Sequence, residues 1–112
     1  MKKFIVLYHA PMSAMEQMQH ATPEDMKKSM EAWMQWAQRC GSGLLDMGAP
    51  LGNAQKMTKM GGMPSQSTVA GYSILQAESM DEAKKMMDGH PHLEWTEGCE
   101  IEIHEAMPTP GM

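Results

Sequence analysis

This chain has few of the residues that mark exported, membrane-spanning or nucleic-acid-binding proteins. Its 112 residues include only two cysteines, Cys40 and Cys99, and without an export signal we expect two reduced thiols. The apolar run at residues 4–8 is shorter than the roughly seven apolar residues of a secretory signal. No stretch approaches the roughly 20 apolar residues of a membrane span. The sequence therefore predicts a cytoplasmic protein with no membrane partner.

Cationic residues are also scarce. Nine Lys and Arg against fourteen Asp and Glu give a net charge of −5, and the nine are scattered along the chain. A nucleic-acid surface needs clustered positive charge, so we expect no nucleic-acid partner. Motifs that hold a cofactor or a metal are missing too: there is no phosphate-binding Gly-rich loop, C-x-x-C, H-E-x-x-H or G-x-S-x-G. We expect no cofactor and no metal site of these kinds.

The pattern that is present predicts one domain over residues 1–112, with a loose tail at 107–112. Strands are expected at 3–9, 44–51, 68–76 and 99–106, and helices at 22–41 and 79–89. Thr22 followed by Pro23 is typical of a helix start, and Ser79 with Glu82 has the spacing of a capping box. Residues 10–22 predict a loop with at most one helical turn, and residues 52–67 predict a mobile loop.

This order of elements predicts an α+β fold. Right-handed connections would give a ferredoxin-like βαββαβ sandwich, with a four-stranded antiparallel sheet and both helices on one face. The other sheet face would then be open. Either a ligand or a second copy would cover it, and a homodimer through the open sheet face is the simpler prediction.

Four segments resemble a known family. They are the opening KKFIVLYH, the helix end W-x-x-W-A-x-x-x-G, the segment GLLDMGAPLG and the closing HPHLEWTEGCEIEIHEAMP. Together they resemble the YCII-related (DGPF-domain) family over almost the whole chain. The resemblance implies a dimeric α+β barrel, and small bacterial proteins that mostly have no assigned function. In some members a His–Asp pair in a cleft is thought to be catalytic.

That pair is not conserved in its usual form here. The family's Asp precedes the Pro at the end of the second helix, where this chain has His90 before Pro91. The family's His lies on the first helix, but residues 22–41 contain no histidine. His90 therefore becomes the first catalytic candidate, because a histidine can exchange protons near neutral pH. The alternative is that His90 and His92 only interact with the negative end of a helix dipole.

Two further residues are catalytic candidates as partners of His90. Asp46 lies among apolar residues of the second strand, where burial would raise its pKa and make it a proton acceptor, although an exposed sheet edge is the alternative. His9 ends the first strand. It would form a polar cluster with Glu102 and His104 on the last strand, unless these residues are simply the solvated side of that strand.

Ligand contacts are predicted from five residues of the expected cleft and cluster: Tyr8, Trp36, His92, His104 and Glu102. Apolar residues at three- and four-residue spacing form one stripe of the helix at 22–41 that is expected to face the core: Met26, Met30, Trp33, Ala37 and Cys40. Trp33 is thus expected to be core, with Trp36 at the margin of this stripe. Sixteen methionines are present, and two M-x-x-M-x-x-M triplets occur at 12–18 and 57–63. Thioethers bind Cu(I), but methionine also fills irregular gaps and adaptable surfaces.

Three functions follow as hypotheses. The first is a cofactor-independent dimer that binds a small organic molecule between sheet and helices and uses His-based acid–base chemistry. The second is a non-catalytic binding or regulatory module. The third is copper handling by Met and His.

Overall fold

The computed structural model describes residues 1–11, 22–95 and 98–108, without the side chains of residues 94 and 95. Its centre is a four-stranded antiparallel sheet with the strand order β2-β5-β1-β6. The strands are β1 (Lys2–His9), β2 (Leu44–Asp46), β5 (Val69–Ala77) and β6 (Glu100–Glu105). Strand β1 lies between β5 and β6, which explains why its sequence is apolar on both faces.

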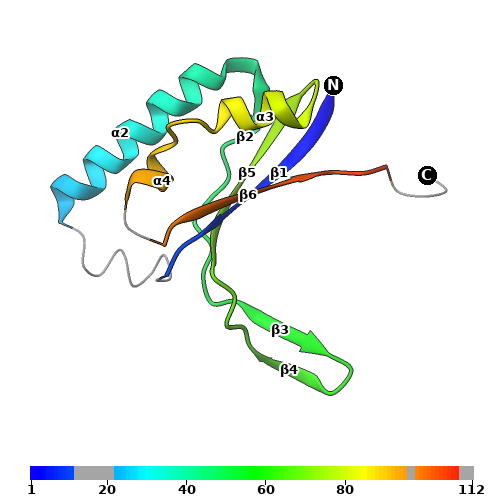
Figure 1. Cartoon of the computed structure of the whole chain (residues 1–112). Coiled ribbons are helices and arrows are strands. Elements are labelled where there is room, and N and C mark those ends of the chain that lie inside the picture. The colour runs from blue at the N-terminus through cyan, green and yellow to red at the C-terminus, as the bar shows by residue number, and fades with distance from the viewer. Residues whose placement is uncertain (12–21, 96–97, 109–112) are drawn as a thin grey trace.

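The helices lie on one side of this sheet (Figure 1). They are α2 (Pro23–Cys40), the 3-10 turn η1 (Gly41–Gly43), α3 (Met80–Met86) and α4 (Pro91–Trp95). The predicted start of the first helix is confirmed, because Thr22 and Asp25 form a reciprocal capping box ahead of the helix. The α+β class is therefore confirmed, together with the four-stranded antiparallel sheet.

The core lies between the sheet and the helices. Alternate residues of the two central strands face it, and Phe4, Val6 and Leu75 are fully buried. Trp36 reaches this core from α2, and its indole N–H donates a hydrogen bond to the Met86 carbonyl at 2.9 Å. The end of α2 is thereby joined to the end of α3.

The burial of α2 differs from the predicted stripe. Trp36 is buried, whereas Trp33 is only half-buried, so their expected roles are reversed. Met26 and Met30 were expected to face the core but are exposed. Residues 22–31 are exposed throughout, so α2 is packed only over its second half. Periodicity identifies an apolar stripe but not how far the neighbouring sheet extends beneath it.

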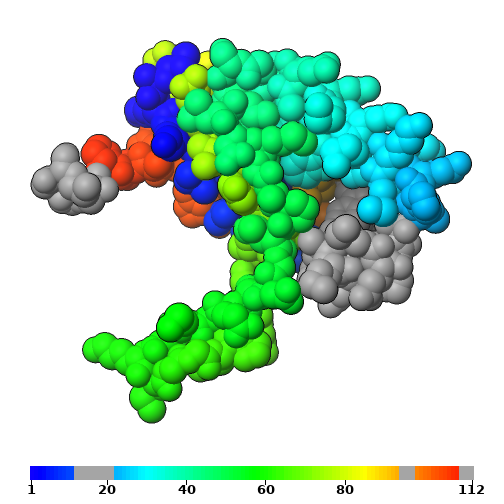
Figure 2. Space-filling model, turned by 180° about the vertical axis from the view of Figure 1, so that it is seen from behind, coloured from blue at the N-terminus to red at the C-terminus, as the bar shows by residue number. Residues whose placement is uncertain are grey.

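The predicted mobile loop at 52–67 is instead a β-hairpin, and that prediction was wrong. Strands β3 (Gln55–Thr58) and β4 (Gly61–Pro64) pair with each other alone and project from the body (Figures 1 and 2). Gly61, with φ of 119°, follows the turn at Lys59 and Met60. The sequence of this segment has no regular apolar alternation, so it did not predict strands.

The second strand is shorter than predicted because the chain makes a close approach at Gly48. Strand β2 ends at Asp46, and a Cβ on Gly48 would lie 1.7 Å from the Tyr72 carbonyl oxygen.

Helix α4 was not predicted, since Pro91 was interpreted as part of a turn. Of the predicted loop at 10–22, residues 12–21 with the first methionine triplet lie outside the described residues. None of the described helices has both the length and the apolar character that a membrane crossing requires.

Candidate functional site

His90, the first catalytic candidate, is fully buried between the sheet and the helices. It immediately precedes α4, and its Nδ1 accepts a hydrogen bond from the backbone N–H of His92 at 3.0 Å. Its Nε2 lies 3.3 Å from the Tyr8 hydroxyl. Tyr8 is also within 2.7 Å of the Ser73 hydroxyl, which donates to the Met47 carbonyl at 2.7 Å. Four groups from separate parts of the chain thus form one buried row.

The protons in this row have only one consistent order. Because Nδ1 of His90 accepts a backbone N–H, a neutral His90 carries its proton on Nε2 and donates it to Tyr8. The Ser73 proton is directed to Met47, so Tyr8 donates its own proton to Ser73. Every hydrogen on these side chains therefore has an acceptor. Ser73 was missed in the sequence, where its only signal is a hydroxyl on the buried face of a strand.

Aromatic rings enclose His90. The ring centroids of Trp33 and Trp36 lie 4.5 and 4.4 Å from its own, both in edge-to-face arrangements. Burial lowers the pKa of His90 from 6.5 to about 3, and the nearby His92 and Arg39 act in the same direction. Burial raises the pKa of Tyr8 far above its ordinary value. Both groups are neutral at physiological pH, which fits a packed structural element better than a proton-transfer site.

Asp46 does not meet His90. It lies on the edge strand β2 and is exposed, as the alternative interpretation expected. Its carboxylate accepts the backbone N–H of Gly48 at 2.8 Å and contacts the Tyr72 hydroxyl at 3.5 Å. Tyr72 alternates with the buried Gly71 and Ser73 on β5, so it points away from the helices. Asp46 and His90 are therefore on opposite faces of the sheet.

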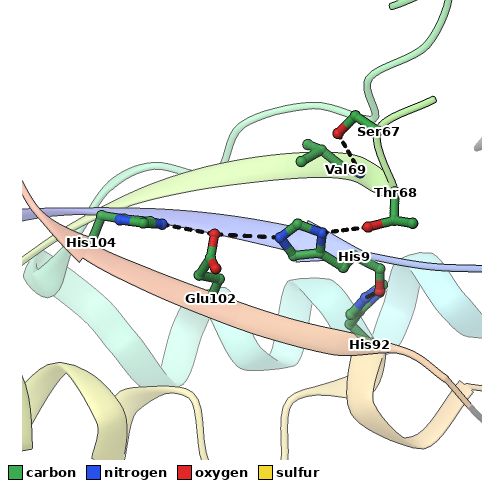
Figure 3. Close-up of polar contacts among 7 residues, drawn as sticks. All are labelled: His9, Ser67, Thr68, Val69, His92, Glu102 and His104. Atoms are coloured by element: carbon green, nitrogen blue, oxygen red, sulfur yellow. Dashed lines mark hydrogen bonds and ion pairs between the residues drawn. The ribbon is translucent and has the colours of Figure 1, made fainter. Parts of the chain in front are cut away.

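His92 joins α4 to the end of β1. Its side chain is buried, and its Nε2–H donates to the backbone carbonyl of His9 at 2.8 Å. Burial lowers the pKa of His92, although its hydrogen bonds to the backbone oppose that effect. Figure 3 shows His92 reaching His9 from the helix side of the strand. Like His90, it acts as a neutral donor that fixes local structure.

The predicted polar cluster of His9, Glu102 and His104 is present on the other face of the sheet (Figure 3). We call these three residues the Glu102 cluster. His104 Nε2 lies 2.7 Å from Oε1 of Glu102, and His9 Nε2 lies 3.5 Å from the same oxygen. The other ring nitrogen of His9, Nδ1, is hydrogen-bonded to the Thr68 hydroxyl at 2.7 Å. Thr68 is a further member that the sequence did not suggest, because it lies in the connection ahead of β5.

The backbone register explains why these side chains meet. Strands β1 and β6 pair so that Leu7 is opposite Glu102 and Ile5 is opposite His104. Residues 5, 7 and 9 of β1 share a face with residues 100, 102 and 104 of β6. The hydrogen bonds from His104 and then from His9 lower the pKa of Glu102. The carboxylate is thus ionised at neutral pH, with two imidazoles directed toward a single oxygen.

The two contacts of Glu102 differ in length, since the contact with His104 is short and the contact with His9 is long. The 3.5 Å between His9 Nε2 and Glu102 is long for a hydrogen bond, and this buried nitrogen makes no other one. His104 is about half exposed, with 55 % of its side chain accessible. Within the described part of the chain, no group of three or more His, Cys, Asp or Glu residues is placed to hold a metal ion.

Two open surface pockets lie elsewhere. One of about 580 Å³ lies between the start of β1 and the residues that follow β6. The other, of about 390 Å³, lies between the C-terminal end of α2 and α3, and its lining includes Arg39, Cys40 and Lys85. Neither contains any of the predicted site residues. Cys40 and Cys99 are thiols, as expected.

Comparison with known proteins gives no assignment. No family model matches the sequence, and no curated protein matches it. The function therefore has to be inferred from the arrangement of the residues themselves.

Proposed function

We propose that this chain forms a homodimer through its open sheet face and uses the Glu102 cluster for cofactor-independent acid–base chemistry on a small organic molecule. The observation that carries this proposal is the single carboxylate oxygen shared by two imidazoles on the face that none of the described helices covers. The ligand is placed on this face, not in the cleft between sheet and helices, because His90 and Tyr8 are already packed and fully hydrogen-bonded.

His104 is the proposed catalytic base. Glu102 accepts the proton that His104 carries on Nε2, which leaves the lone pair on Nδ1. A carboxylate that holds one nitrogen of an imidazole fixes its tautomer and stabilises the imidazolium formed when the other nitrogen takes a proton. Because His104 is half exposed, a molecule on the sheet face can reach Nδ1.

His9 is the proposed positioning residue. Thr68 holds its Nδ1, and its Nε2 faces Glu102 at 3.5 Å. The contact from His9 contributes to the lowered pKa of Glu102 and so favours its ionised form. His9 thereby limits the positions that the Glu102 carboxylate can take.

The dimer is supported by the apolar centre of the same face. Ile5, Leu7, Tyr72 and Ile74 are half-buried and lie side by side on the paired strands β1 and β5. A second copy would remove these side chains from water, which is favourable by roughly 25 cal/mol per Å² of apolar surface. The strand order β2-β5-β1-β6 supports the proposal of a ferredoxin-like sandwich, and the segments that resemble the YCII-related family imply a dimeric α+β barrel.

A non-catalytic binding module is the second proposal. Its support is that His90, His92 and Tyr8 are all neutral and take part in structural hydrogen bonds. The same sheet face would then bind a ligand without changing it. Copper handling has less support, because the hairpin register pairs Lys56 with Met63 and Met57 with Gly62. Met57 and Met63 are thus on opposite faces of the hairpin, and their thioethers diverge.

The test is proton exchange in heavy water. A panel of small carbonyl compounds would be incubated with the protein in D2O, and loss of the α-proton signal would be followed by NMR. We expect at least one compound to exchange, and His104→Gln and Glu102→Gln to slow exchange by about a hundredfold, the usual contribution of a positioned acid–base group. Glu31→Gln, which removes an exposed carboxylate on α2, is the matched control and should exchange like the wild type.

The outcomes separate the two proposals. Exchange that persists in His104→Gln would refute the catalytic role of His104. A compound that shifts the resonances of the Glu102 cluster but exchanges no proton would instead support the binding module.

A further inference from the structure

The β3–β4 hairpin contacts the body of its own chain too little to be stabilised by it. Every residue of both strands is exposed, including Met57 at 84 % and, in the turn, Met60 at 93 %. A two-stranded hairpin with no other support is marginally stable in water. Contact with a second molecule would remove these exposed apolar side chains from water.

The hairpin is cationic in an otherwise anionic chain. Between Asp46 and Glu78 the only charged residues are Lys56 and Lys59, and both lie in the hairpin. Strand β6 has the opposite character, because Glu100 and Glu102 are exposed along it. Within the described part of the chain, β6 pairs only with β1, so its outer edge is available for a further strand.

The two elements are placed so that two copies can exchange them. The hairpin continues from β2 and β5 at one edge of the sheet, and β6 forms the opposite edge. Both the hairpin and the end of β6 project away from α2 (Figure 1), and the surface is hollowed between them (Figure 2). A two-fold axis would bring the hairpin of each copy to the β6 of the other, so that one contact would be made twice.

We infer that the β3–β4 hairpin of one copy docks on strand β6 of a second copy, with Lys56 and Lys59 against its Glu100 and Glu102. The added hairpin extends the sheet across the dimer and covers the Glu102 cluster of the second copy. Each site is then complete only in the dimer. This inference rests on the homodimer of the proposed function and deepens it by naming the contact that closes the site.

The experiment is a charge exchange, read by sedimentation velocity of the full chain over a range of concentrations. Lys56→Glu with Lys59→Glu should raise the dimer Kd by roughly thirtyfold or more, because the two attractive pairs of each of the two contacts become repulsive. Glu100→Lys with Glu102→Lys should do the same. Mixing the two variants should restore a dimer. In one of its contacts the acidic hairpin of the first variant faces the basic β6 of the second, and the other contact keeps the wild-type charges on both sides.

A matched control reverses two lysines elsewhere. Lys27→Glu with Lys28→Glu changes the net charge equally on the exposed half of α2, and the Kd should stay within about twofold. Replacing residues 55–64 by Asn-Gly tests the hairpin without reversing charge, because Ala54 and Ser65 are already hydrogen-bonded at 2.9 Å. We expect this deletion variant to be folded by circular dichroism and monomeric by sedimentation velocity.

The outcomes distinguish this inference from the proposed function. If Leu7→Asp on the open sheet face dissociates the dimer and the hairpin variants do not, the sheet-face dimer stands and hairpin docking is overturned. If the hairpin variants dissociate the dimer and Leu7→Asp does not, hairpin docking stands without the sheet-face contact. A wild-type chain that is monomeric at all concentrations overturns both.

Discussion

Acid should destabilise this protein through one buried residue, His90. In the folded chain its pKa is lowered to about 3, whereas the same group in the unfolded chain has its ordinary value of 6.5. The groups around it are Tyr8 on β1, Trp36 and Arg39 on α2, and His92 on α4. None of them supplies a carboxylate that would stabilise an imidazolium. Protonation is therefore disfavoured by the whole environment.

The sign and size of the effect follow from linkage. Between pH 6.5 and pH 3 the unfolded chain binds a proton at this position and the folded chain does not, so the free energy of unfolding falls as the pH falls. At pH 5 the pKa of His90 in the unfolded chain is about 1.5 units above the pH, which corresponds to a loss of about 2 kcal/mol in the free energy of unfolding relative to pH 7. Above pH 7 the contribution of His90 to the pH dependence vanishes. The lowered pKa of His92 acts in the same direction.

Urea denaturation at pH 7 and pH 5 measures this loss. His90→Gln can still donate a hydrogen bond toward Tyr8 but cannot titrate, so it should be less stable at pH 7 and lose most of the pH dependence. Gln38→Ala is the control, because Gln38 is an exposed residue of α2 that carries no titratable group and should leave the acid loss unchanged. If wild type and His90→Gln lost the same free energy between pH 7 and pH 5, the ordered neutral row around His90 would be refuted.

Two further substitutions test the structure. Tyr8→Phe should lower the free energy of unfolding by about 2 kcal/mol, because the buried Nε2–H of His90 would lose its only acceptor; a loss below about 0.5 kcal/mol in urea would contradict the assigned proton order. Gly48→Ala should cost about 3 kcal/mol or more, because the residue has φ of 83° and its Cβ would overlap the Tyr72 carbonyl. Gly62→Ala is the control, because the nearest atom to its added Cβ would be 3.9 Å away, and its free energy of unfolding should lie within about 1 kcal/mol of wild type. Equal losses of unfolding free energy at the two glycines would contradict this account.

Local patterns predicted the elements whose sequences carry their own signal. Strand β1 and the start of α2 were found because alternation and capping are set by neighbouring residues. The hairpin at 55–64 was missed because its strands bury nothing, so no apolar alternation appears. The exposure of Met26 and Met30 was missed for a related reason: the helix extends beyond the sheet, and the length of a sheet is a property of strands far away in the sequence.

The sequence predicted the grouping of the Glu102 cluster, whereas the predicted pairing of His90 with Asp46 was wrong. His9, Glu102 and His104 were placed together correctly, because the pairing of the first and last strands fixes which side chains are neighbours. The partnership of His90 with Asp46 depended on which sheet face Asp46 occupies. The register shift between Leu44 and Asp46 places Asp46 opposite Ile74, on the face without helices. An irregularity of that kind is set by the close approach at Gly48 and leaves no signal in strand alternation.

The two sheet faces suit opposite uses of histidine, and solvent access decides which use each histidine can have. On the helix side, burial makes protonation of His90 unfavourable, and both of its nitrogens are engaged, so it has no lone pair left for a substrate. On the open side, Glu102 holds one nitrogen of His104 and leaves the other free to act. A base needs an unoccupied nitrogen and a counter-charge for its protonated form. Among the described residues only the Glu102 cluster supplies both, and for that reason we propose that the chemistry takes place on the face that a barrel dimer would enclose.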